Sequence, residues 1–140
     1  MRNTDKIQHL GKVPLFAGLN RRQLGEVARH TDDIEVAAAT DLTSEGHVGR
    51  QFGIVLSGSA VVKRNNRKLA DLGKGDFFGE MALLLQQPSS ATVTTMEDST
   101  LLVMHGREFT SLLDSVPAIA RKLAEGLAAR LVEADRKLVL

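Results

Sequence analysis

Residues 73–84 read GKGDFFGEMALL, and this stretch is the most informative part of the 140-residue chain. The glycines at 73 and 75 predict a turn, the two phenylalanines are typical core anchors, and Gly79 allows a close backbone approach. Residues 80–83 then predict one helical turn, whose unpaired first amides can attract an anion. A glycine before a short helix is also common in simple connectors, so this signal alone is weak.

A second segment, PSSATV at residues 88–93, begins six residues after Ala82 and leads directly into a strand. It presents small residues and hydroxyl donors, and its spacing suggests that it faces the same cavity as residues 73–84. No histidine or lysine lies at motif distance from these hydroxyls, which disfavours a nucleophile. The ordinary interpretation is that they are hydroxyls at the start of a strand.

Short apolar runs separated by turn residues fill the chain from Ile34 to His105, which predicts many short strands. Pairs such as Ser57-Gly58 and Asn65-Asn66 suit tight reversals. Many short antiparallel strands indicate a sandwich or a jelly-roll barrel. The expected strands are 34–37, 41–43, 51–56, 60–64, 68–72, 91–96 and 100–104.

Helices are predicted before the strands. Thr4 is expected to cap a short helix that Gly11 ends. Asn20, with Gln23 three residues later, forms a capping-box pattern for a helix over 21–30.

Helices are also predicted after the strands, a short one over 107–113 and a long one that starts near Pro117 and runs to Leu140. Apolar residues recur every three or four positions along the long helix up to its last turn, and this stripe must be covered. We expect a homodimer formed through 117–140. The alternative is a single-chain helix that lies along the barrel.

Composition excludes several classes of chemistry. With 43% apolar residues and 18 basic against 17 acidic residues, the chain suits one compact domain and has no strong field for nucleic acid or an anionic membrane. It contains no cysteine, which excludes disulfides and thiolate metal sites, and no tryptophan or tyrosine, which disfavours a base-stacking platform. Residues 1–12 do not resemble a signal peptide or spanning helix, so we expect a cytoplasmic protein.

Other polar residues favour structural roles. The four histidines lie in different predicted elements without metal-ligand spacing, so neither a metal nor another cofactor is expected. Asp32-Asp33 is interpreted as a solvated turn and not as an acid/base pair. Three methionines, Met81, Met96 and Met104, lie in apolar runs and are predicted to be core. We therefore do not expect an enzyme.

The chain resembles the cyclic-nucleotide-binding domain family, the sensing module of catabolite-activator-type transcription regulators, cyclic-nucleotide-dependent kinases and gated channels. Residues 73–84 resemble its phosphate-binding cassette almost residue for residue. The resemblance runs over nearly the whole chain and implies a mainly β fold with flanking helices, an eight-stranded antiparallel jelly roll (double-stranded β-helix). The other matching motifs are Phe16-Ala17-Gly18-Leu19, Glu45-Gly46, Ile54-Val55-Leu56-Ser57-Gly58-Ser59 and Ser90-Ala91-Thr92-Val93.

The resemblance also implies one domain over residues 1–140. The N-terminal helices would occupy 1–33 and the C-terminal helices 106–140. The β-roll would occupy 34–105 and contain the cassette at 73–92.

Ligand-binding roles follow from the same resemblance. Glu80 would accept a hydrogen bond from a ribose hydroxyl, and backbone amides beside it would approach the cyclic phosphate or ribose. Ser90 and the Ala91 amide would contact the phosphate, and the C-terminal helix would close over the purine near residues 134–135. The full expected set is Phe78, Gly79, Glu80, Met81, Ala82, Ser89, Ser90, Ala91, Thr92, Ala134 and Asp135.

One position departs from the family pattern. Where the family carries an arginine that pairs with the cyclic phosphate, this chain has Ser89. A hydrogen bond to a charged group is worth about 1.5–3 kcal/mol, so affinity is expected to fall roughly tenfold to a hundredfold or more. Arg50 or Arg64 could substitute from a neighbouring strand, although such arginines more often face solvent. Glu80 is equally compatible with ribose binding and with a purely structural role.

We therefore expect a regulatory sensor of cAMP or a related nucleotide or nucleoside, with weak binding and signalling through the C-terminal helix. The alternatives are a ligand-free interaction or dimerisation module, with an unknown protein partner, and a truncated effector domain of a transcription regulator. Direct contact with nucleic acid or membrane is not expected.

Overall fold

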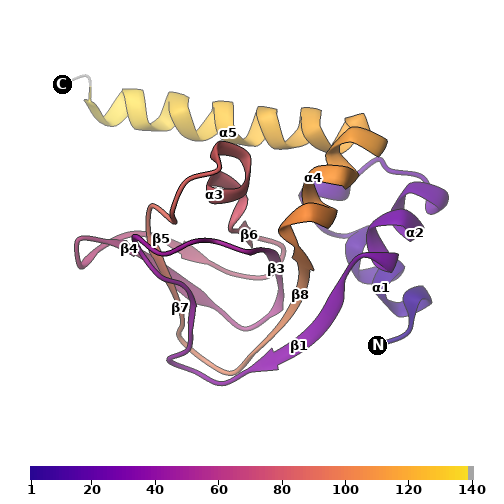
Figure 1. The fold of residues 1–140 in the computed structure, drawn as a ribbon, viewed down its shortest axis with the longest axis horizontal. Helices are drawn as coiled ribbons and strands as arrows, with labels where there is room; N and C mark the ends of the chain where they lie inside the picture. Colours follow the sequence, from indigo (N-terminus) through magenta and orange to yellow (C-terminus); the bar gives the residue numbers. More distant parts are fainter. Residues whose placement is uncertain (139–140) are drawn as a thin grey trace.

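Eight strands form two antiparallel four-stranded sheets in the structure, a computed structural model that describes residues 1–138. The strand orders are β1-β8-β3-β6 and β2-β7-β4-β5, so that nearly every connection crosses from one sheet to the other (Figure 1). This topology is the predicted jelly roll. The strands are β1 (Asp32–Val36), β2 (Asp41–Thr43), β3 (Gln51–Ser57), β4 (Ala60–Arg64), β5 (Arg67–Leu72), β6 (Phe77–Phe78), β7 (Thr92–Thr95) and β8 (Ser99–His105).

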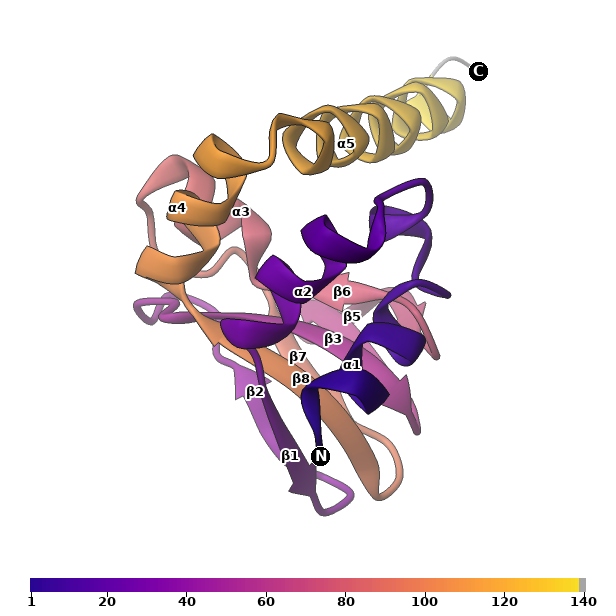
Figure 2. The ribbon, with the colours of Figure 1, turned by 90° about the vertical axis from the view of Figure 1, so that its right-hand side faces the viewer.

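The helices flank the β-roll, and the last and longest of them runs past α3 along the edge of the molecule (Figure 1). A view from the side shows the N-terminal helices against the sheet that contains β3 and β8 (Figure 2). No helix within residues 1–138 is long and apolar enough to cross a membrane. The helices are α1 (Asn3–Leu10), the 3-10 turn η1 (Pro14–Phe16), α2 (Arg21–Arg29), α3 (Glu80–Leu85), α4 (Gly106–Ser115) and α5 (Pro117–Leu138).

The N-terminal caps of α1 and α2 differ in how well they match the sequence predictions. At α2 the capping box is confirmed, because Asn20 Oδ1 accepts from the Gln23 amide at 2.8 Å and Gln23 Oε1 accepts from the Asn20 amide at 2.9 Å. At α1 the prediction was wrong: the helix begins at Asn3 after Arg2, and no side chain caps it, so Thr4 lies inside the first turn.

Two apolar clusters share the strands β3 and β8, which are buried on both faces and therefore have nearly continuous apolar sequences. Ile54 and Leu102 point toward the helices, where they pack with Phe16, Val27, Phe109 and Ile119. Val55 and Leu101 point between the sheets and pack with Val93. Each such side chain removed from water contributes roughly 1.5–3 kcal/mol, so this arrangement fixes the sheet against both layers.

Several sequence predictions need correction. Strand β6 was not predicted, because two residues are too few to show a strand period. Asp32 and Asp33 lie within strand β1 and not in a turn, and Asp33 Oδ1 pairs with the N-terminal ammonium at 3.1 Å. Met81 and Met96 are 42% and 62% exposed and do not belong to the core. The predicted helix end at Leu140 lies outside the described residues.

Candidate functional site

The cassette is attached to the sheet by a close fit between β6 and β3. Phe78 pairs with Gly53 in register, and a Cβ on Gly53 would overlap the Phe78 ring. The missing side chain of Gly53 therefore makes the space that Phe78 fills, which is a common reason for a glycine inside a strand. Phe78 is buried as a result, and the chain that follows it is held next to β3.

Gly79 turns the chain from β6 into α3. It is the residue before the helix, its φ of 89° lies in the left-handed region, and a Cβ there would overlap the carbonyl oxygen of Gln51. Both the backbone conformation and the close approach require glycine. The turn places Glu80 at the first position of α3, and of the two residues that follow, Met81 is exposed and Ala82 is buried.

Glu80 is buried, with 4% of its surface exposed, and its carboxylate faces helix α5. Arg130 Nη1 donates to Glu80 Oε1 at 3.2 Å, and the guanidinium carbon lies 5.1 Å from the centre of the Phe77 ring. Burial raises the pKa of Glu80 above its ordinary value, although a backbone hydrogen bond and Arg130 act in the opposite direction. Sequence reasoning missed Arg130, because it lies among the polar residues that flank the apolar stripe of α5.

The segment that leaves the cassette is fixed by backbone and hydroxyl contacts. Ser89 is buried, its amide donates to the His47 carbonyl at 2.8 Å, and its own carbonyl accepts from the Gly46 amide at 2.8 Å. The next carbonyl, that of exposed Ser90, accepts from Arg64 Nε at 2.9 Å, so Arg64 does lean toward this segment.

The next two residues, Ala91 and Thr92, accept hydrogen bonds from the last residue of β2 and from the segment that follows it. The Ala91 carbonyl accepts from the Thr43 hydroxyl at 2.9 Å. The Thr92 hydroxyl accepts from the Glu45 amide at 3.0 Å. These residues therefore hold the 43–46 segment against the start of β7.

Comparison with known proteins decides the family. The family model described as "Cyclic nucleotide-binding domain" matches residues 34–116. The chain belongs to this family. The match begins within β1, includes the other seven strands and residues 73–84, and ends just before α5.

Relatives of this cyclic nucleotide-binding domain include a receptor, an activator and a channel. The "Cyclic AMP receptor protein" of Thermus thermophilus is 33% identical over 132 residues, which cover 91% of this chain and 61% of that protein. The crystal structure of the Thermus thermophilus Catabolite Activator Protein has a TM-score of 0.82 at 32% identity and covers 89% of this chain and 61% of that one. A cyclic nucleotide-gated potassium channel of Rhizobium etli is 34% identical over 116 residues, 83% of this chain and 32% of the channel. The chain thus spans less than two thirds of each of these relatives.

The structure brings together only part of the expected binding set. Phe78 to Ala82 lie together at the end of β6 and the start of α3, and Ser89 to Thr92 lead into β7. Ala134 and Asp135 lie on α5 beyond Arg130 and are exposed. Arg130 is thus the residue through which α5 contacts the Glu80 carboxylate.

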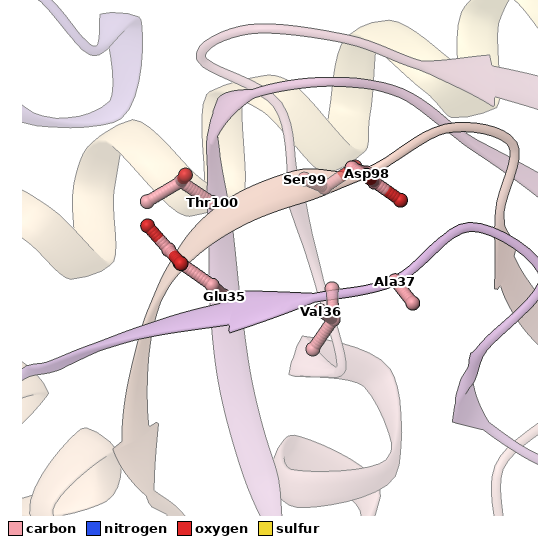
Figure 3. A pocket seen from close by; sticks show the side chains of 6 residues that line it. All are labelled: Glu35, Val36, Ala37, Asp98, Ser99 and Thr100. Carbon is pink, nitrogen blue, oxygen red and sulfur yellow. The ribbon is translucent and has the colours of Figure 1, made fainter.

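A hollow that Glu80 does not line lies between the end of β1 and the start of β8. It has a volume of about 410 Å³, and Figure 3 shows the Glu35 carboxylate beside Thr100, its register partner. Asp98 Oδ1, at the same hollow, accepts from the Ala38 amide at 3.0 Å. Two carboxylates make this hollow unsuitable for a phosphate group. Within residues 1–138 no group of three or more acidic or histidine side chains could hold a metal ion.

Proposed function

We propose that this domain is a regulatory sensor that binds cAMP or a related nucleotide between the cassette and α5. The observation that carries the proposal is the buried Glu80 carboxylate at the start of α3, with Arg130 of α5 as its ion-pair partner. A buried carboxylate needs a hydrogen-bond donor, and a ribose hydroxyl can donate to it in place of the guanidinium. The ligand and Arg130 would therefore compete for hydrogen bonds to the Glu80 carboxylate.

This competition gives a route for signalling through α5. The Arg130 side chain is 53% exposed, so its ion pair with Glu80 is worth of order 1 kcal/mol or less. A ligand that takes the carboxylate would have to offset this ion pair to free Arg130, while Ile119 and Leu123 would still hold the start of α5 against the domain. A ligand shifts a conformational equilibrium only by its differential affinity for the two states, and here that difference would arise at Glu80.

Weak binding belongs to the same proposal. Ser89 offers a neutral hydroxyl where the family resemblance implies an arginine, so the cyclic phosphate loses a charge-assisted pair. The expected loss is roughly tenfold to a hundredfold or more.

A homodimer formed through 117–140 is a further part of the proposal. Ile119 and Leu123 are buried against the domain, whereas Leu131 and Val132, farther along α5, are 64% and 52% exposed. The apolar stripe thus continues beyond the part of the helix that its own chain covers. A second α5 is the partner that would bury it.

We propose one domain over residues 1–140, a regulatory and not a catalytic role, and a cytoplasmic location. The alternative that this chain is a truncated effector domain of a transcription regulator is a separate proposal.

Calorimetric titration with cAMP, cGMP, cyclic dinucleotides and adenosine tests the sensor. Arg130→Gln is expected to tighten binding by up to about fivefold, because the competitor for Glu80 is removed. Arg121→Gln is the matched control, since Arg121 lies on the same helix and pairs with Glu125 at 3.4 Å. The absence of heat with every nucleotide at millimolar concentration would exclude the sensor.

The second candidate is a ligand-free interaction module, and the Arg130–Glu80 pair also favours it, because the carboxylate already has a partner. Ser89→Arg separates the two candidates. If the native protein binds cAMP weakly and Ser89→Arg binds it about ten to a hundred times more tightly, the sensor is supported. If only Ser89→Arg binds, the native domain is a ligand-free module.

A further inference from the structure

The hairpin formed by β4 and β5 ends in a group of exposed basic residues. Asn65 and Asn66 occupy its two turn positions with φ values of 51° and 63°, as a tight two-residue hairpin turn requires. The hairpin extends beyond the rest of the β-roll at one end of the molecule (Figure 1). We call residues 63–69 the basic hairpin, and its basic residues are Lys63, Arg64, Arg67 and Lys68, all of them exposed.

The register of the two strands sets like charges opposite each other. Lys63 pairs with Lys68, and Arg64 pairs with Arg67. Like charges at directly opposite positions destabilise an antiparallel pair, whereas opposite charges stabilise it. The needs of folding therefore do not account for these four cations, and the attraction of an anionic partner does.

Nearby carboxylates neutralise only part of this charge. Asp71 Oδ2 lies 2.7 Å from Lys68 Nζ, and Glu45 Oε1 accepts from the Asn65 amide at 3.0 Å. Four basic side chains against two carboxylates leave a surplus of two positive charges. The whole chain has a net charge of only +1, so the total averages over this local surplus. The expectation of no membrane contact rests on that total.

An exposed leucine lies next to the cations. Val62 pairs with Ala70 and Lys63 with Lys68, so Leu69 is an extra residue in β5, a β-bulge. Its side chain is 51% exposed. A leucine beside positive charges suits the surface of a bilayer, where anionic headgroups meet acyl chains. Nucleic acid would attract the cations but offers the leucine no comparable apolar layer, and a second copy of the hairpin would be repelled.

We propose that the basic hairpin docks this domain on an anionic lipid bilayer, with its cations at the headgroups and Leu69 in the interface. Each Lys or Arg near such a surface raises the affinity by up to about fivefold. Binding through one short hairpin is reversible and weakens as salt is added, because salt screens exposed charges. The proposal does not depend on Glu80 or on nucleotide binding.

Sedimentation of the domain with lipid vesicles tests the proposal. At low ionic strength the domain is expected to sediment with vesicles of phosphatidylserine and phosphatidylcholine in equal amounts and to stay in solution with phosphatidylcholine alone. Lys63→Gln and Arg67→Gln should each lower the affinity by up to about fivefold, and together by up to about thirtyfold. The control is Arg21→Gln with Arg22→Gln, which removes the same charge from exposed residues of α2 at the other end of the molecule (Figure 1).

Leu69→Ser separates a bilayer from a partner that attracts the cations alone. It leaves the charge unchanged and is expected to weaken binding to the anionic vesicles by about fivefold. The paired variant Lys63→Gln with Arg67→Gln relieves like-charge repulsion, so its urea midpoint should be no lower than that of the wild type.

Three results would overturn the proposal. The first is equal binding to vesicles with and without phosphatidylserine. The second is a loss of affinity in the α2 control as large as in the paired hairpin variant. The third is an unchanged affinity in Leu69→Ser together with binding to a duplex oligonucleotide, which would assign the basic hairpin to nucleic acid.

Discussion

The glycine that turns β6 into α3 makes a quantitative prediction possible, because a matched glycine lies elsewhere in the chain. Gly79 and Gly18 have φ values of 89° and 88°, but only at Gly79 would a Cβ meet other atoms within 4 Å. Placing an L side chain in the left-handed region costs roughly 1–2 kcal/mol, and we expect Gly18→Ala to lose about this much. Gly79→Ala adds an overlap with the Gln51 carbonyl oxygen, which costs about 1–3 kcal/mol more.

Urea unfolding of the two variants and the wild type measures these terms directly. The total loss expected for Gly79→Ala is about 2–5 kcal/mol, and the difference between the two variants isolates the steric part. The comparison requires that the dependence of the unfolding free energy on urea concentration has the same slope in all three proteins. If Gly79→Ala is no less stable than Gly18→Ala, the close approach of the cassette to β3 is not what requires glycine there.

Three further predictions concern Glu80, Gly126 and Asn20. Because burial raises the pKa of Glu80 in the folded state, its contribution to stability is fully present below its ordinary value of 4.5 and is lost as pH rises through the raised pKa. The unfolding free energy of Glu80→Gln relative to wild type should therefore increase between pH 4 and pH 7, and a constant difference would contradict this. Gly126→Ala, where the site on α5 has open space, is expected to stabilise by about 0.5–1 kcal/mol, measured as a higher midpoint of thermal unfolding. Asn20→Ala should lose about 1 kcal/mol in urea unfolding, and no change would mean that the capping box contributes little.

Most of the fold could be predicted from the sequence because its signals are local. Strands β2 and β4 begin and end where the apolar runs predict, and the Asn20–Gln23 capping box appears where the pattern places it. These features depend on residues within a few positions of one another. The periodicity of the chain therefore predicts them without knowledge of the packing.

The rest of the site depends on contacts between distant residues. Strand β6 is only two residues long, and its position depends on the space left by Gly53, 25 residues before Phe78 in the chain. Arg130 lies 50 residues from Glu80. A basic residue on the polar side of an amphipathic helix gives no signal of such a partner.

The apolar cluster on the helical side of the β-roll has a consequence for how the protein is made. It joins Leu10, Phe16 and Val27 from the beginning of the chain to Phe109 and Ile119 from the other side of the β-roll in sequence. During translation the first helices emerge well before these partners have been synthesised, although N-terminal segments generally fold first. The first 30 residues must therefore wait, with apolar surface uncovered, until the ribosome has passed the β-roll.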